Sequence, residues 1–168
     1  MLPFVVIGSM FYHDGLPFSL YLFIFFSIPV CITDIRSRRI PLWCVYSGTG
    51  VLFLTSFFLF PSQAGNLLLG MLSGPVVFMA VRLFTKGKLG MGDVTFAAFT
   101  GVFNGFPGWF IATGLASLFG LLFAAAGMLA GRLDRNSRIP FAPFLTLGSV
   151  GAYFAVPILL RTIAGVPA

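Results

Sequence analysis

The chain has 168 residues, of which 58% are hydrophobic and 17% aromatic, and it carries a formal net charge of +6. Only 8% of its residues are charged, against roughly 25% in an average soluble domain, and this composition excludes a soluble globule. Apolar stretches of about 20 residues recur along the chain, which is the length that an α-helix needs to cross a bilayer. The sequence therefore predicts an all-α, multi-pass membrane protein.

The first apolar run, residues 2–12, is interrupted by the polar residues His13 and Asp14. The run is too short to cross a hydrocarbon core of about 30 Å. It also lacks the preceding basic residues that are typical of a signal peptide. We therefore expect residues 1–15 to form an interfacial segment that stays in the mature chain.

Three clusters of basic residues divide the rest of the chain, at 36–39, 82–88 and 132–138. Each interval between two clusters is long enough for two membrane spans joined by a polar turn. One more apolar run precedes the first cluster, and another follows the last. The sequence therefore predicts a single transmembrane domain, 1–168, with a bundle of six helices. The expected spans are approximately 16–34, 41–60, 64–84, 92–104, 107–131 and 141–161.

All three basic clusters lie on one face in this arrangement. The positive-inside rule assigns that face to the cytoplasm, so both termini are expected outside. The fourth span, 92–104, is unusually short, because at about 1.5 Å per residue it covers only about 20 Å. We expect its cytoplasmic end, which begins near Asp93, to be recessed in a water-filled cleft. An ionisable residue in such a place indicates a functional role.

The few titratable residues restrict the possible chemistry. Glutamate is absent and His13 is the only histidine, so neither a zinc site nor a Ser/His/Asp triad on the cytoplasmic face can be assembled. A pair of aspartates remains, with Asp34 ending the first span and Asp93 beginning the fourth. Two carboxylates within about 3 Å share a proton, so that one activates water while the other polarises a carbonyl. Such a pair hydrolyses amides without a metal or a cofactor, and we expect neither.

Taken alone, each aspartate also has a structural interpretation. An aspartate after a glycine at a helix start is commonly an N-cap that accepts hydrogen bonds from free N–H groups. Asp34 has Arg36 and Arg38 within four residues as partners for an ion pair. The residues by themselves leave these alternatives open.

Three motifs strongly resemble, in order and spacing, those of the type IV prepilin peptidase family, which comprises membrane aspartyl proteases of the GxGD class. The motifs are Asp34-Ile35-Arg36-Ser37-Arg38-Arg39-Ile40-Pro41, Gly90-Met91-Gly92-Asp93-Val94 and Ile139-Pro140-Phe141-Ala142-Pro143-Phe144-Leu145-Thr146-Leu147-Gly148. The resemblance implies that Asp34 and Asp93 are the catalytic pair. It also implies an active-site loop of Gly90, Met91 and Gly92. Supporting or substrate-side roles are expected for Arg38, Pro41, Lys88, Pro140 and Pro143.

This resemblance implies an aspartic endopeptidase that removes a short basic leader from prepilins or pseudopilins at the cytoplasmic face of the bacterial inner membrane. The expected partners are such substrates and membrane lipids, and no nucleic acid. The chain departs from the family pattern at Leu42, Thr95 and Ala142, which concerns substrate detail more than chemistry. The paired CxxC region of many bacterial members, associated with methylation of the new pilin terminus, has no counterpart here. We therefore expect a stand-alone protease part without methyltransferase activity.

Two other classes of function remain open at this point. A small transporter or channel would also be polytopic and would use intramembrane aspartates to bind ions or relay protons. An inactive pilus-assembly scaffold would retain the fold without turnover. The presence of both aspartates argues against a scaffold, and ion flux without proteolysis would identify a transporter.

Overall fold

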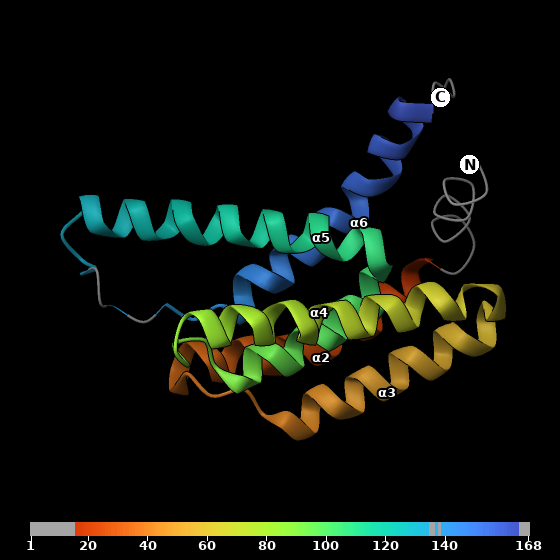
Figure 1. The fold of residues 1–168 in the computed structure, drawn as a ribbon, viewed down its shortest axis with the longest axis horizontal. Helices are drawn as coiled ribbons and strands as arrows, with labels where there is room; N and C mark the ends of the chain where they lie inside the picture. Colours follow the sequence, from red (N-terminus) through yellow and green to blue (C-terminus); the bar gives the residue numbers. More distant parts are fainter. Residues whose placement is uncertain (1–15, 135–136, 138, 165–168) are drawn as a thin grey trace.

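The computed structural model describes residues 16–134, 137 and 139–164, and the regular structure of this part is entirely helical (Figure 1). The elements in chain order are α2 (Leu16–Ser37), α3 (Leu42–Leu59), the short 3-10 helix η1 (Pro61–Gln63), α4 (Ala64–Phe84), α5 (Met91–Leu129) and α6 (Ala142–Ala164). The expected interfacial segment 1–15 and both termini lie outside the described residues.

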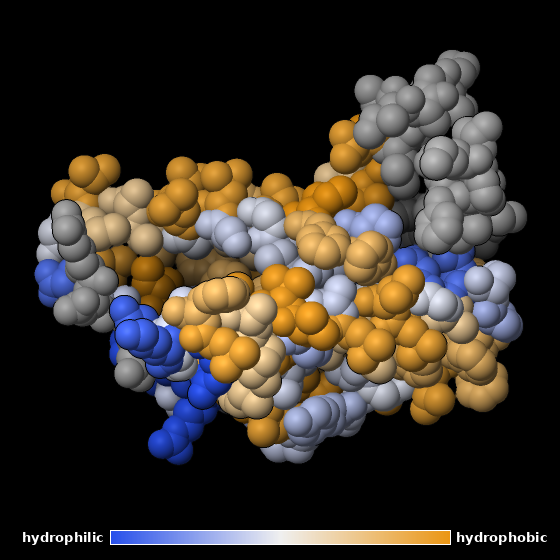
Figure 2. Space-filling view, in the orientation of Figure 1, coloured by the Kyte–Doolittle hydropathy of each residue, from blue (hydrophilic) through white to orange (hydrophobic). Residues whose placement is uncertain are grey.

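Four helical segments are long and apolar enough to cross a membrane, and α6 adds a shorter apolar stretch, Ala142–Val156. The four segments are Phe18–Ser37, Leu42–Leu59, Pro61–Phe84 and Met91–Leu129. Their outer surfaces carry large hydrophobic side chains that are exposed in the isolated chain. Figure 2 shows such side chains spread over the helices, with strongly hydrophilic residues gathered mainly at one end of this face. This distribution fits an integral membrane protein with an all-α fold.

Five α-helices are present in the described residues, so the prediction of six separate helices is not confirmed. The fourth and fifth predicted spans form one element, the 39-residue helix α5, which is interrupted by the non-helical backbone of Gly105 (φ 66°, ψ 177°). Figure 1 shows that α5 bends sharply and that its second arm runs back in the opposite direction. The side chain of Asn66 on α4 accepts a hydrogen bond from the N–H of Phe106 at 3.0 Å. This hydrogen bond caps the N-terminus of the second arm of α5, so the two arms are joined at the bend without a separate loop.

Small residues allow α4 and the first arm of α5 to pack backbone against backbone. A Cβ atom added at Gly70 or at Gly101 would collide with the carbonyl oxygen of the other glycine, and one at Gly74 would collide with the carbonyl of Ala97. Close approach through small residues is a common way to join helices in a bilayer, where burial of apolar surface offers little driving force. This contact fixes the first arm of α5, which begins with the predicted active-site residues, against α4.

Stacked aromatic rings connect α2 to α5 and α6 in the core. Phe23 on α2 stacks on Phe99 and Phe103 of α5, with ring centroids 5.0 and 4.0 Å apart. Phe103 in turn stacks on Tyr153 of α6 at 5.4 Å. Aromatic pairs at these separations stabilise helix contacts beyond the burial of their area. The stack therefore holds α2 next to α5 and α6.

Candidate active site

Asp34 lies in the last turn of α2, where the chain turns sharply. Arg38, which follows the helix, has a positive φ of 51°, and its N–H donates a hydrogen bond to the carbonyl oxygen of Asp34 at 2.9 Å. A residue in the left-handed conformation at this position is a common way to end a helix. The turn directs Arg39 and Ile40 to the pocket that Asp34 also lines.

The carboxylate of Asp34 is held by the third sequence motif, far away along the chain. The N–H of Ala142, the first residue of α6, donates a hydrogen bond to Asp34 Oδ2 at 3.0 Å. Only 6% of Asp34 is exposed, and a buried carboxylate needs such a partner. The N-terminus of α6 also presents the positive end of its helix dipole to this group. Asp34 thus lies in the last turn of α2 and next to the N-terminus of α6.

Asp93 lies in the first turn of α5 and is half-buried. Gly90 is the N-cap residue of this helix and supplies no side-chain cap. The carboxylate of Asp93 lies over Gly90, because a Cβ atom added there would be only 2.9 Å from Asp93 Oδ2. Glycine at position 90 therefore leaves room for the carboxylate itself.

Gly92 brings the first and second motifs into direct contact. A Cβ atom added at Gly92 would be 2.7 Å from the Cβ atom of Ile40, a separation that real Cβ atoms do not tolerate. The start of α5 thus packs closely against the segment that follows α2. This contact holds the first turn of α5, which carries Asp93, against the segment that follows Asp34.

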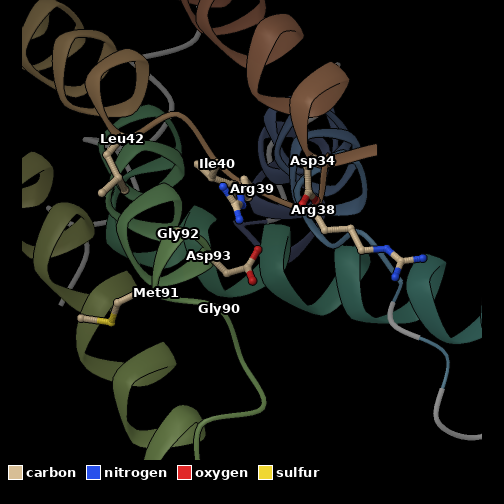
Figure 3. A pocket seen from close by; sticks show the side chains of 9 residues that line it. All are labelled: Asp34, Arg38, Arg39, Ile40, Leu42, Gly90, Met91, Gly92 and Asp93. Carbon is tan, nitrogen blue, oxygen red and sulfur yellow. The ribbon is translucent and has the colours of Figure 1, made fainter. Parts of the chain in front are cut away.

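The two aspartates line one pocket of about 340 Å³. Figure 3 shows both carboxylates pointing into this space, while the side chain of Arg38 extends away from it. Because both carboxylates line the same pocket, negative charges on the two groups would repel each other. The lining residues are Asp34, Arg38, Arg39, Ile40, Leu42, Gly90, Met91, Gly92 and Asp93.

The structure brings together both predicted catalytic residues, the three residues of the predicted active-site loop and Arg38. The pocket lining does not include the other predicted supporting residues, Pro41, Lys88, Pro140 and Pro143. Pro41 is instead the N-cap of α3, and Pro143 follows Ala142 in the first turn of α6. Sequence reasoning missed Arg39, Ile40 and Leu42 as lining residues, although Arg39 and Ile40 belong to the first motif.

A buried carboxylate with an N–H partner beside a half-exposed carboxylate can share one proton and act on a water molecule. Within the described part of the chain, no group of three or more His, Cys, Asp or Glu side chains is arranged to hold a metal ion. The side chains that line the pocket thus offer acid–base chemistry by Asp34 and Asp93.

Comparison with known proteins identifies the family. The chain is 35% identical over 86 residues to the prepilin leader peptidase/N-methyltransferase of Bacillus subtilis (strain 168), a match that covers 51% of this chain and 35% of that relative. The chain thus spans about a third of the length of the relative it matches. No solved structure matches it significantly. The sequence profile of the type IV leader peptidase family matches residues 21–125, which include both aspartates of the pocket, and the chain therefore belongs to this family.

Proposed function

We propose that this chain is an aspartic endopeptidase that removes the basic leader peptide from type IV prepilins or prepilin-like proteins. Asp34 and Asp93 are its catalytic residues. One observation carries the proposal: two carboxylates from α2 and α5 point into a single pocket whose shape depends on the Gly-x-Gly-Asp turn. Membership of the leader peptidase family supports the substrate class.

In this proposal, the scissile peptide lies between the two carboxylates. The ionised aspartate takes a proton from a water molecule as the water oxygen attacks the carbonyl carbon. The protonated aspartate donates its proton to the carbonyl oxygen, which gives a neutral tetrahedral diol. When the C–N bond breaks, the aspartate that took the proton of water gives it to the leaving amine, and the other aspartate takes a proton from a diol hydroxyl as the carboxylic acid forms. The pair therefore again holds one proton. Only the two carboxylates and water take part in this cycle.

The helix ends near the pocket allow either carboxylate to hold the negative charge. Position along α2 alone disfavours a charge on Asp34, because a helix C-terminus carries a partial negative charge. The hydrogen bond from Ala142 at the start of α6 offsets this effect. Asp93 also lies at a helix N-terminus. Both aspartates can therefore carry the shared charge, as a pair that exchanges the roles of acid and base requires.

The proposed orientation places the pocket at the cytoplasmic face of the bacterial inner membrane. The pocket lies where α2 ends and α5 begins, beside Arg38 and Arg39. Basic residues at helix ends favour the cytoplasmic side. A prepilin cut there would lose its leader while its hydrophobic helix stays in the bilayer.

Substitution of three aspartates tests the proposal. Asp34→Asn and Asp93→Asn keep the size of the side chain but cannot exchange a proton, so each is expected to abolish cleavage of a co-expressed prepilin. Asp134→Asn is the matched control, because Asp134 is exposed beyond the end of α5 and lies outside the pocket.

Membrane abundance and cleaved product are measured in the same samples, because a structural role shows as lost protein and a catalytic role as lost turnover. Asp134→Asn is expected to match the unmodified chain in both measurements. Cleavage by a well-accumulated Asp34→Asn or Asp93→Asn variant would refute the proposed function.

A further inference from the structure

We propose that Arg82 is a positioning residue, which clamps the loop before α5 and thereby holds Asp93 in place. The inference rests on the proposed function, because it assigns Asp93 a catalytic role. Arg82 is in the last turn of α4 and is not among the residues that line the pocket. Its part in the reaction is therefore indirect.

The start of α5 has no cap from the side chain of its N-cap residue. Its N-cap residue, Gly90, has no side chain to cap the helix, and its backbone N–H donates a hydrogen bond to the carboxylate of Asp93 itself. The backbone bond from the N–H of Val94 to the carbonyl of Gly90 is long, at 3.4 Å. Side-chain caps commonly contribute about 1 kcal/mol to a helix start. The position of Asp93 in this first turn therefore depends on the loop that leads into it.

Arg82 holds this loop from the neighbouring helix. Its Nη1 atom donates hydrogen bonds to the carbonyl oxygen of Leu89 and, at 3.5 Å, to that of Gly87. Leu89 immediately precedes Gly90 and packs against the hydrophobic core. One guanidinium thus connects the end of α4 to the residue next to the N-cap of α5. Hydrogen bonds from charged donors are roughly twice as strong as neutral ones.

The backbone of the loop is shaped to make this contact. Lys86 and Gly87 both have a positive φ, of 52° and 83°, and the N–H of Gly87 donates to the carbonyl of Arg82 at 2.8 Å. A positive φ at a non-glycine residue such as Lys86 is uncommon and needs support from its surroundings. The chain changes direction in this loop, so that the carbonyls of Gly87 and Leu89 face Arg82.

The clamp acts together with the glycine contacts between α4 and α5. The glycine contacts, made around Gly70 and Gly101, fix the position of the first arm further along the helix. Arg82 fixes its first turn, where Asp93 lies. Loss of the clamp frees only the end of the helix, so we expect misplacement of the carboxylate without loss of the fold.

Kinetics of Arg82→Gln and Arg82→Lys test the proposal. Arg82→Gln is expected to lower kcat by about 10²-fold, because a displacement of about 1 Å in a catalytic group has an effect of this size. KM is expected to stay within about twofold of the value for the unmodified chain. Arg82 does not line the pocket, so the contacts that bind the substrate are retained. Arg82→Lys keeps the charge and one compact donor group but loses the planar fork, so we expect an intermediate kcat.

Hydrogen exchange provides a readout that does not depend on activity. Amides of residues 86–93 in Arg82→Gln are expected to exchange about tenfold faster than in the unmodified chain, while those of the second arm of α5 are unchanged. Arg132→Gln is the control, because Arg132 lies just beyond the end of another helix, α5, and is exposed, with its backbone N–H bonded to the carbonyl of Gly127 at 2.9 Å. It is expected to match the unmodified chain in both assays.

The outcomes separate this inference from the proposed function. If the unmodified chain cleaves prepilin and Asp93→Asn does not, a normal kcat or normal exchange in Arg82→Gln overturns the clamp. If no cleavage occurs at all, the proposed function fails, and unchanged exchange in residues 86–93 still overturns the clamp. If Arg82→Gln does not accumulate, Arg82→Lys decides, and a normal kcat together with normal exchange overturns the inference.

Discussion

Gly92→Ala perturbs the contact that brings the two halves of the candidate site together. The added Cβ atom would lie 2.7 Å from Cβ, 3.2 Å from Cγ1 and 3.3 Å from Cδ1 of Ile40. Carbon atoms make their best contacts at about 3.5 to 4.0 Å. The first turn of α5 must therefore move by about 1 Å away from Ile40, and Asp93 moves with it.

A shift of about 1 Å in a reacting group lowers a rate by about 10²-fold, which corresponds to about 2.7 kcal/mol in the activation free energy. Alanine has a higher helix propensity than glycine by about 1 kcal/mol, so the variant is expected to accumulate in the membrane. The assay is the initial rate of prepilin cleavage divided by the amount of membrane-inserted protein. We expect a loss of about 10²-fold in this ratio.

Gly114→Ala is the control, because it makes the same change in the same helix at a position where an added Cβ atom meets nothing within 4 Å. It is expected to leave the rate unchanged. Ile40→Ala retains the nearest atom, Cβ, so it is not expected to restore the cleavage rate of Gly92→Ala. Ile40→Gly removes that atom and is expected to restore the rate. A normal rate for well-accumulated Gly92→Ala would refute the idea that this contact positions Asp93.

Three further predictions concern the bend, the topology and the proton. Gly105→Ala is expected to lower the thermal stability of the purified protein by about 1 kcal/mol or more, because φ at this position is 66° and an L-residue is strained there; unchanged thermal unfolding would contradict this. In a cysteine-free background, cysteines introduced at Ser37 and Lys86 are expected to be labelled from the cytoplasm and one at Ser62 from outside, and reversal at any of these sites would contradict the topology. The rate of cleavage is expected to depend on two ionisations, because a carboxylate pair titrates as one coupled unit; a pH profile with a single ionisation would exclude the shared proton.

The sequence predicted the pairing of Asp34 and Asp93 because charge clusters mark helix ends, and an even number of spans between two ends returns the chain to the same face. A turn between the spans 92–104 and 107–131 was predicted, but not that the two spans would form one helical element, α5, bent at Gly105. The polar residues around Gly105 indicated a loop between two spans. Their effect depends on Asn66, which caps Phe106 from another helix, and no local pattern reveals such a distant partner.

The surroundings of the candidate site were also harder to predict than the aspartates themselves. The nearby arginines were interpreted as alternative partners for Asp34, but its carboxylate accepts a hydrogen bond from the N–H of Ala142, 108 residues away. Arg82 was interpreted only as part of a basic cluster that sets topology. Its contact with Leu89 depends on two positive φ angles in the loop, and a basic residue near a helix end carries no signal for that geometry.

The most direct test of the central claim is a double substitution that asks whether Asp34 and Asp93 act as one unit. Mass spectrometry measures the fraction of a co-expressed prepilin that has lost its leader, with the unmodified chain, each Asp→Asn variant and the double variant at equal membrane abundance. Groups that act together are grossly non-additive. We predict that each single substitution removes as much cleavage as the double substitution does. Partial losses in the single variants that combine to the loss in the double variant would contradict a shared catalytic pair.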